Sequence, residues 1–150
     1  MSGFTLLEMM MVIALVAVLS TGSWQGWQRW QQRQQLDDSA RQVQRLLMRI
    51  RSDAWWHNAA RLIWFKPGEP WCLGSGPVPE ICGTPARLRL LAPWSGVSVR
   101  SLTADIGFYG QMNTARPGSI VIANGSGIRR IIVSSRGRVR ICQHSGESCR

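Results

Sequence analysis

Apolar residues fill the first part of the chain and then give way to a spaced pattern. Between Met9 and Gln28 no residue is ionisable, and most are Met, Val, Leu, Ile or Ala. About twenty residues of α-helix span roughly 30 Å, which is the thickness of the hydrocarbon core of a bilayer. The pattern therefore predicts a helix that crosses a membrane. Trp24, Trp27 and Trp30 follow the span, as aromatic residues do at a membrane interface.

The next segment keeps a helical period but is apolar on one side only. Apolar residues recur at steps of four and three, at Leu36, Ala40, Val43, Leu47, Ile50 and Ala54. This spacing predicts one continuous helix from Phe4 to about Trp56, with Asn58 near its end, whose apolar stripe packs on a sheet. The polar positions Arg41, Gln42, Arg45 and Arg49 fall on other faces, where solvent is their simplest surrounding.

Beyond residue 60 the pattern changes to short strands separated by Pro and Gly. The predicted strands are Arg61–Phe65, Arg87–Leu91, Val97–Leu102, Ile106–Tyr109, Ser119–Ala123, Ile128–Ser134 and Arg138–Gln143. The sequence ANGSG at 123–127 predicts a hairpin turn, and residues 68–85 are predicted to be a loop. The order of elements predicts an α+β fold, with a long helix laid on an antiparallel sheet.

The charge and the cysteines add information about surroundings. The formal net charge is +10, and Lys66 is the sole lysine among 18 basic residues, so polyanionic partners are favoured alongside simple solubility. Four cysteines in a chain with a membrane signal favour disulfides in an oxidising compartment. Short loops favour the pairs Cys72–Cys82 and Cys142–Cys149 among the three pairings that the sequence allows.

Catalytic and metal sites find little support in the sequence. His57 and His144 are the only histidines, and neither lies in a nucleophile, metal or phosphate-loop motif. A metal site built from Cys142, His144 and Cys149 is the rival to the second disulfide, but it lacks the paired spacing typical of zinc sites. We therefore expect no enzymatic activity, no metal and no cofactor.

Glu8 is the one acid close to the membrane segment. A carboxylate near the bilayer centre costs about 2.5–3.5 kcal/mol on insertion scales, so such a residue usually has a partner. Glu8 is also suited to the positive N-terminus of a helix, which is the simpler interpretation. Cleavage after Gly3 would leave the apolar helix on the mature protein and create a new α-amine on Phe4. We expect that amine, from a neighbouring subunit, to be the partner of Glu8.

The run Gly3-Phe4-Thr5-Leu6-Leu7-Glu8, followed by the apolar helix, resembles the class III prepilin signature of type IV pilins and pseudopilins. The resemblance implies that prepilin peptidase cleaves between Gly3 and Phe4, that Phe4 is N-methylated, and that Glu8 contacts the N-terminus of a neighbour during assembly. It also implies the type IV pilin fold, with 1–3 as leader, 4–28 as the transmembrane and assembly half of the helix, 29–58 as its amphipathic half, and 59–150 as a periplasmic antiparallel β domain. The leader has no basic residue, which departs from the family pattern.

The C-terminal half resembles minor pilins of the GspH/FimT type. Residues 133–140, VSSRGRVR, are similar to their closing hairpin, which ends in Gly-Arg-x-Arg. Over the full length the chain resembles the group of prepilin peptidase-dependent protein A, through Trp56-His57-Asn58, Trp71-Cys72-Leu73, Asn113-Thr114-Ala115 and residues 137–143. In this family the Gly-Arg-x-Arg motif is associated with DNA binding.

The arginines of that hairpin have two interpretations. On a strand Arg136, Arg138 and Arg140 would share one face while Val139 and Ile141 face the core, and Arg129 and Arg130 on the adjoining strand would extend the patch. Such a patch would bind phosphates. Alternatively, the charges discourage aggregation at a sheet edge or pair with acids of another pilin, and this interpretation is the favoured one.

The functional prediction is a minor type IV pilin of the inner membrane, single-pass, with its C-terminal domain in the periplasm and a place at the pilus tip. It would act in a priming complex with other minor pilins, the major pilin and the inner-membrane assembly platform. The alternatives are a minor pilin that binds DNA for uptake in transformation and a pseudopilin of type II secretion. The sequence does not distinguish the pilus from the secretion machine.

Overall fold

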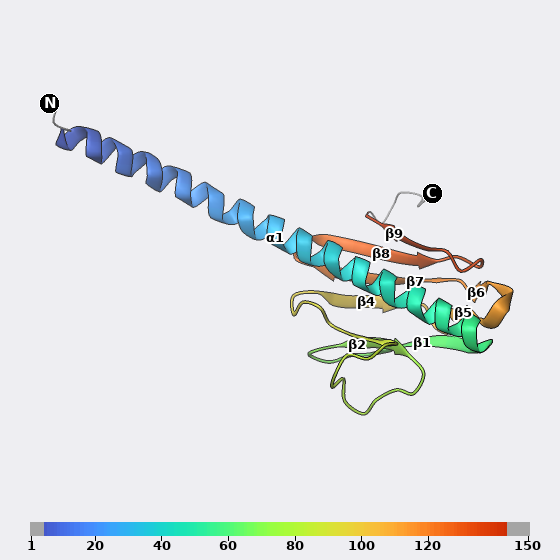
Figure 1. The fold of residues 1–150 in the computed structure, drawn as a ribbon. Helices are drawn as coiled ribbons and strands as arrows, with labels where there is room; N and C mark the ends of the chain where they lie inside the picture. Colours follow the sequence, from blue (N-terminus) through green and yellow to red (C-terminus); the bar gives the residue numbers. More distant parts are fainter. Residues whose placement is uncertain (1–4, 144–150) are drawn as a thin grey trace.

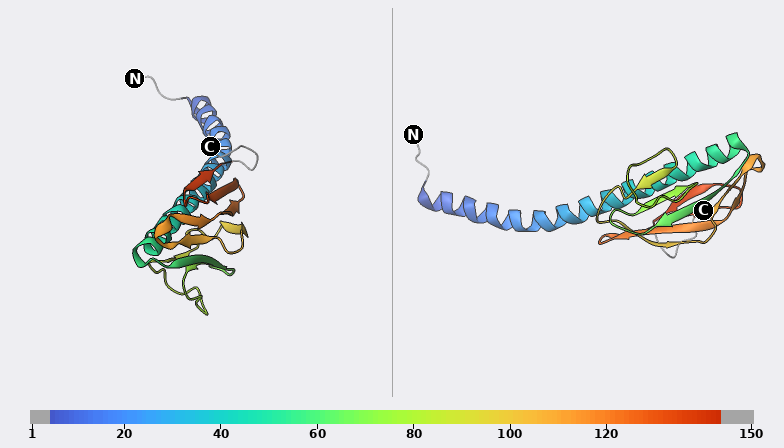
Figure 2. Two further views of the ribbon diagram at one scale, coloured as in Figure 1. Left: turned by 90° about the vertical axis from the view of Figure 1, so that its right-hand side faces the viewer. Right: turned by 90° about the horizontal axis from the view of Figure 1, so that it is seen from below.

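The computed structural model describes residues 5–143, which form one long helix followed by a β domain (Figure 1). Helix α1, Leu6–His57, has 52 residues and is unbroken through Gly22 and Gly26. It is gently curved, and its N-terminal half stands clear of the domain while its C-terminal half lies along the sheets (Figure 2). The prediction of one continuous helix is confirmed over the described residues.

The end of α1 is set by its backbone conformation. Asn58 adopts a left-handed conformation with φ of 45°, which asparagine tolerates better than most residues. The backbone N–H of Ala59 donates to the carbonyl of Ala54 at 3.1 Å. The side-chain oxygen of Asn58 accepts a hydrogen bond from the N–H of Gln111 at 3.2 Å. The helix end is therefore tied to the β domain.

The strands that follow α1 form two antiparallel sheets. The first has the order β3-β2-β1-β5-β6 and the second the order β4-β7-β8-β9. Their bounds are β1 Ala60–Lys66, β2 Cys72–Ser75, β3 Arg89–Leu91, β4 Ser98–Leu102, β5 Gly107–Tyr109, β6 Thr114–Arg116, β7 Gly118–Asn124, β8 Gly127–Val133 and β9 Val139–Cys142. A short 3₁₀ turn, η1 Gly110–Met112, separates β5 from β6.

The core lies between α1 and both sheets. The six residues of the predicted apolar stripe, Leu36 to Ala54, are all 1% exposed or less. They pack with Ile63 and Phe108 of the first sheet and with Ile120, Ile122, Ile131 and Val133 of the second. The prediction that this stripe covers a sheet is confirmed, and the sheet side of the contact uses alternate residues of each strand.

The predicted hairpin at 123–127 is confirmed. Asn124 pairs with Gly127 across a two-residue turn, and the side-chain oxygen of Asn124 accepts from the N–H of Ser126 at 2.9 Å. The side-chain N–H of Asn124 donates to the carbonyl of Gln32 at 2.7 Å. This turn therefore fixes one end of the second sheet to α1.

The sequence predicted seven strands in one sheet, whereas the described residues form nine strands in two sheets, so this prediction was wrong. β2 lies inside the segment predicted to be a loop, and β6 was not predicted. β2 is buried at all four positions because Gly74 brings the backbone close to its neighbours: a Cβ there would lie 2.6 Å from the carbonyl oxygen of Leu88. Hydrogen bonds link the two sheets. The N–H of Ala115 in β6 donates to the carbonyl of Ser135, in the β8–β9 turn, at 2.9 Å, and the indole of Trp71, before β2, donates to the carbonyl of Val97, before β4, at 2.7 Å.

The predicted Cys72–Cys82 disulfide is present, with 5.7 Å between the two Cα atoms. It closes a loop that leaves β2. Lys66 on β1 donates from its Nζ atom to the carbonyl of Pro79 at 2.7 Å and also to that of Glu80. Cys142 is buried at the end of β9. Its predicted partner, Cys149, lies outside the described residues, so the second disulfide stays a prediction.

Candidate functional site

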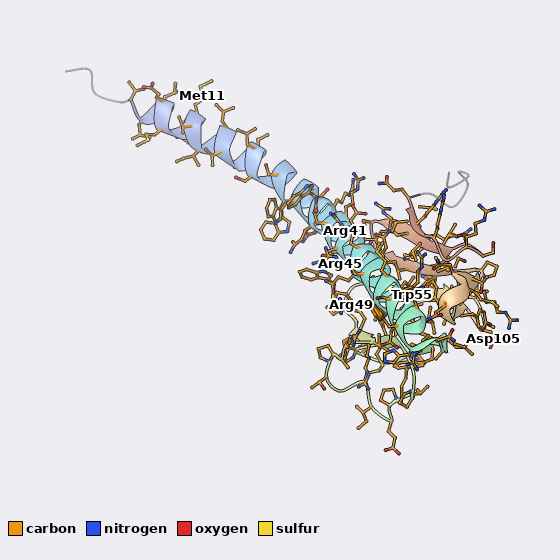
Figure 3. All side chains as sticks on the ribbon, turned by 45° about the vertical axis from the view of Figure 1, so that its right-hand side comes forward. Met11, Arg41, Arg45, Arg49, Trp55 and Asp105 are labelled. Atoms are coloured by element: carbon orange, nitrogen blue, oxygen red, sulfur yellow. A yellow bond between two sulfur atoms is a disulfide. The ribbon has the colours of Figure 1, made fainter. Side chains whose placement is uncertain are left out.

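The N-terminal half of α1 presents an uncovered apolar surface. Every residue from Thr5 to Gln34 is exposed. α1 is long and apolar enough near the N-terminus to cross a membrane, and none of its most apolar stretch is buried against the domain. Side chains there, including the labelled Met11, project outward around the helix (Figure 3). Such a surface requires lipid or other protein around it.

Glu8 lies in the first turn of α1. Thr5 is the extended residue before the helix, and the backbone N–H of Glu8 donates to the carbonyl of Thr5 at 3.0 Å. The first turn leaves free N–H groups that favour a negative charge. Among residues 5–143 no basic side chain forms an ion pair with Glu8. The cleavage and methylation positions Gly3 and Phe4 lie outside the described residues.

The Gly-Arg-x-Arg motif forms the turn between β8 and β9. Gly137 has φ of 72°, a left-handed value that suits glycine. Its N–H donates to the carbonyl of Ser134 at 2.8 Å, and the N–H of Arg138 donates to the Ser134 hydroxyl at 3.1 Å. Strand β9 begins only at Val139, so Arg136 and Arg138 belong to the turn and not, as predicted, to the strand.

The arginines of this turn nevertheless lie around one open hollow. Arg136, Arg138 and Arg140 are exposed and line it together with Ile132, Ser134 and Ser135. Arg140 pairs with Ile132 across the strands, so both project from the sheet face that points away from α1. Three guanidinium groups and two hydroxyls around a concave surface are suited to an anion. Val139 and Ile141 pack against the core from the other face, as predicted.

Arg129 does not extend this patch, which corrects the prediction from strand adjacency. Its Nε atom lies 2.7 Å from Oδ1 of Asp37 on α1, and its side chain is 15% exposed. Arg129 alternates with the outward residues of β8 and therefore faces the helix. Arg130 is exposed and shares the outward face with Ile132, but it does not line the hollow.

A buried carboxylate that the sequence pattern did not predict lies near the end of α1. Asp53 is 4% exposed. Its Oδ2 atom accepts from Nε of Arg61 at 2.8 Å, while Oδ1 lies 3.4 Å from Nδ1 of His57 and 3.9 Å from Nη2 of Arg87. A polar residue next to the buried Ala54 in the helical pattern was the available signal. This network connects α1 to β1 and to the segment before β3.

Within residues 5–143 no cluster of His, Cys, Asp or Glu could hold a metal ion. The rival metal site of the sequence analysis used His144 and Cys149, which lie outside this range. The described part of the chain therefore offers two candidate sites, the assembly half of α1 with Glu8 and the basic hollow at the β8–β9 turn.

Comparison with known proteins gives two matches. The family model for the prokaryotic N-terminal methylation motif matches residues 1–24. The crystal structure of the type IV minor pilin FimU from Pseudomonas aeruginosa strain PAO1 matches with a TM-score of 0.55 and 17% identity, over 75% of this chain and 91% of that chain. No curated protein matches the sequence.

These matches define the class of fold and signal. The chain has the type IV pilin fold, its first residues match the N-terminal methylation motif, and the resemblance to type IV pilins that residues 3–8 predicted is confirmed. The solved structure that matches is that of a minor pilin, and at 17% sequence identity this match shows the fold alone. A pilin fold also agrees with the expectation that the chain is not an enzyme. The narrower GspH/FimT assignment stays a prediction.

Proposed function

We propose that this chain is a minor type IV pilin that helps to initiate pilus assembly. In this proposal it is inserted in the inner membrane with the β domain in the periplasm, cleaved between Gly3 and Phe4 by prepilin peptidase, and methylated on Phe4. It then joins other minor pilins in a priming complex on the assembly platform and is placed at the pilus tip, next to the major pilin.

The observation that supports this proposal best is the division of α1. One unbroken helix has an exposed apolar half, with Glu8 in its first turn, and a second half that packs against its own domain. An acid in the first turn suits the N-terminus of any helix, but a carboxylate that lies in lipid also requires a partner. In surroundings without water, a carboxylate attracts the N-terminal amine of a neighbouring subunit strongly. Because the two groups must lie close together, the pair also sets the axial position of one subunit relative to the other.

The test removes the charge of Glu8. Glu8→Ala and the isosteric Glu8→Gln should still lose the leader, as seen by mass spectrometry, and should remain in the membrane fraction. Incorporation into sheared filaments should fall about tenfold or more, because close charge pairs at an interface contribute well over 1.4 kcal/mol. Glu69→Ala, an exposed acid of the β domain, is the matched control and should be incorporated normally.

Normal incorporation of both Glu8 variants would remove the pairing argument. An uncleaved polypeptide in cells that make pili would contradict the processing step. Deletion of the gene with unchanged surface piliation would contradict the assembly role itself.

DNA binding is the second candidate function, and the basic hollow at the β8–β9 turn favours it. Its three arginines come from a turn and a strand and surround a concave surface that faces away from α1. No carboxylate lines the hollow among the described residues. Contacts of this kind would be made to phosphates, without recognition of base sequence.

Its test uses the full chain in detergent and a DNA duplex. Arg138→Ala with Arg140→Ala should weaken binding and reduce the slope of log affinity against log salt by about 1.8, since each phosphate contact contributes about 0.9. Arg41→Ala with Arg45→Ala removes the same charge from α1 and should leave the slope unchanged. Equal retention of DNA by the hollow variant would contradict this function.

A further inference from the structure

Three arginines form a row on the face of α1 opposite the core. We call Arg41, Arg45 and Arg49 the arginine stripe; all three are exposed. They succeed one another along the C-terminal half of the helix (Figure 3). At 3.6 residues per turn they fall, with Met48, Ser52 and Trp55, within an arc of about 120°, and neighbouring arginines differ by about 6 Å in height. The buried stripe from Leu36 to Ala54 occupies the opposite side.

The positive charge of the stripe is not matched within the described chain. Arg41 donates from Nε to the backbone carbonyl of Asp37 at 3.3 Å, and none of the three arginines forms an ion pair among residues 5–143. Asp37 and Asp38 are the acids nearest in the helical pattern, but both are engaged elsewhere. Oδ1 of Asp37 lies 2.7 Å from Nε of Arg129, and Oδ2 of Asp38 accepts from Gln42 at 2.8 Å and from the Trp94 indole at 3.0 Å. The face therefore presents three adjacent positive charges.

An apolar contact surface continues the stripe toward the end of α1. Met48 is 50% exposed and Trp55 is 43% exposed. Together with Arg51, Ser52 and Asn113 they line an open hollow, where Nη2 of Arg51 donates to the side-chain oxygen of Asn113 at 3.2 Å. Arginine, methionine and tryptophan are enriched in the cores of protein–protein interfaces, and arginine and tryptophan among the residues that dominate binding energy.

We propose that this face of α1 binds a different pilin subunit, one that presents a row of acidic residues. The inference deepens the proposed function, since it names the chemistry of the neighbour in the priming complex. Acids spaced by about 6 Å, as at every fourth position of a helix, would match the arginines one to one. An apolar pocket on the partner would receive Trp55.

A second copy of this chain does not fit that description. The acids of residues 9–143 number six, and Asp37, Asp53 and Asp105 are each in ion pairs while Asp38 accepts hydrogen bonds from Gln42 and Trp94. Glu69 and Glu80 lie apart, on either side of β2. With a formal net charge of +10, two copies also repel each other. The partner is therefore a different, acidic subunit.

Nucleic acid is a weaker fit for this face than a protein. The stripe lies on the same unbroken helix as the membrane half, so a subunit that packs along this helix would reach it. The exposed Met48 and Trp55 at its end offer apolar contact that a phosphate backbone does not use. The hollow at the β8–β9 turn, in contrast, is lined by one apolar residue, Ile132, beside two serines and three arginines.

The experiment reverses the charge of the stripe in the full-length chain. Arg41→Glu, Arg45→Glu and Arg49→Glu are combined, and the variant is co-expressed with each of the other pilin subunits of the host cell in turn. A matched control, Arg100→Glu, Arg116→Glu and Arg130→Glu, changes the net charge equally on exposed residues of the β domain that line neither hollow. A milder variant, with Gln at the three stripe positions, is included, and all are checked for leader cleavage and thermal unfolding.

We expect the Glu stripe variant to bind one acidic subunit about tenfold or more weakly in detergent, while the control binds normally. Raising the salt concentration should weaken the wild-type association, because exposed charges are screened. Acid-to-Arg substitutions in that subunit should restore binding to the Glu variant. The Gln variant should show an intermediate loss.

Several results would overturn the proposal. It is contradicted if the Glu stripe variant binds the acidic subunit as the wild type does, or if the control loses as much binding as the stripe variant. It is also contradicted if acid-to-Arg substitutions in the partner do not restore binding to the Glu stripe variant, or if the Glu stripe variant loses retention of DNA and keeps subunit binding. The proposed function fails separately: it is contradicted if the gene deletion leaves piliation unchanged, whatever the stripe variants do. Conversely, if Glu8→Ala abolishes assembly but the stripe variants bind the other subunits normally, only this inference is refuted.

Discussion

The two halves of α1 have the same backbone conformation but opposite surroundings. Residues 6–34 are exposed throughout, whereas nine residues between Leu36 and Ala54 are buried against the two sheets. In Figure 1 the first half extends from the domain and the second lies across it. One continuous element thus depends on two different environments, its own β domain for one half and lipid or neighbouring subunits for the other.

This difference shows where stability and assembly are each decided. In the second half, buried leucines and isoleucines contribute to folding of the single chain, because their apolar surface leaves water when the domain forms. In the first half, the same residue types contribute nothing to that equilibrium and act only when a membrane or another subunit covers them. A matched pair of substitutions, one in each half, separates the two roles.

The largest contrast should come from two leucines. Leu47→Ala should lower the free energy of unfolding of the β domain by about 2–5 kcal/mol, because Leu47 is fully buried and its truncation leaves a cavity. Leu15→Ala, in the exposed half, should leave that free energy unchanged. Chemical unfolding of the full chain in detergent, followed by tryptophan fluorescence, checks both. Equal effects would mean that the two halves are not independent.

A smaller contrast concerns membrane insertion. Ile13→Arg should make insertion less favourable by about 2.5–3.5 kcal/mol, the cost of an arginine near the centre of a span. Ile128→Arg places the same residue at an exposed position of β8 and should not affect insertion. The measurement is the fraction of protein that resists alkaline extraction from membranes. Full extraction resistance of Ile13→Arg would place the span elsewhere.

The smallest effect should come from the carboxylate at the junction of α1 and the sheets. Asp53→Asn should lower the free energy of unfolding by about 1–3 kcal/mol, since charge-assisted bonding to Arg61 is lost in a nearly buried site. Asp105→Asn, which breaks the exposed pair with Arg116 at 3.3 Å, should cost at most about 1 kcal/mol. Asparagine also tolerates the left-handed conformation of residue 105, so backbone strain adds no further loss of stability to this variant.

The parts of the fold with strong periodicity were predictable from the sequence. The buried stripe from Leu36 to Ala54, the apolar span, and seven of the strands follow from spacing and residue type. β2 was missed because Gly74 and the surrounding Gly and Pro residues resemble a loop, although this glycine serves close packing between strands. β6 was missed because its residues, Thr, Ala and Arg, include no large apolar side chain that would mark a strand in the sequence.

The candidate site was predictable in its residues but only partly in its geometry. Arg136, Arg138 and Arg140 do lie together, yet a turn brings this about, since β9 starts at Val139. Arg129 was assigned to the wrong face because the alternation along β8 has no absolute direction until the sheet is placed on α1. Asp53 was missed because its partners Arg61 and Arg87 lie on β1 and before β3, and only the placement of those segments against the end of α1 brings the three charges together.

The continuity of α1 has a mechanical consequence. A rod without a hinge transmits displacement from one end to the other, so any pull on the membrane end reaches the domain through the interlocked side chains between Leu36 and Ala54. The force needed to pull α1 out of the β domain along the helix axis then depends on the packing of those side chains against the sheets. The hydrogen bond from Asn124 to Gln32 lies at the point where the rod leaves the domain.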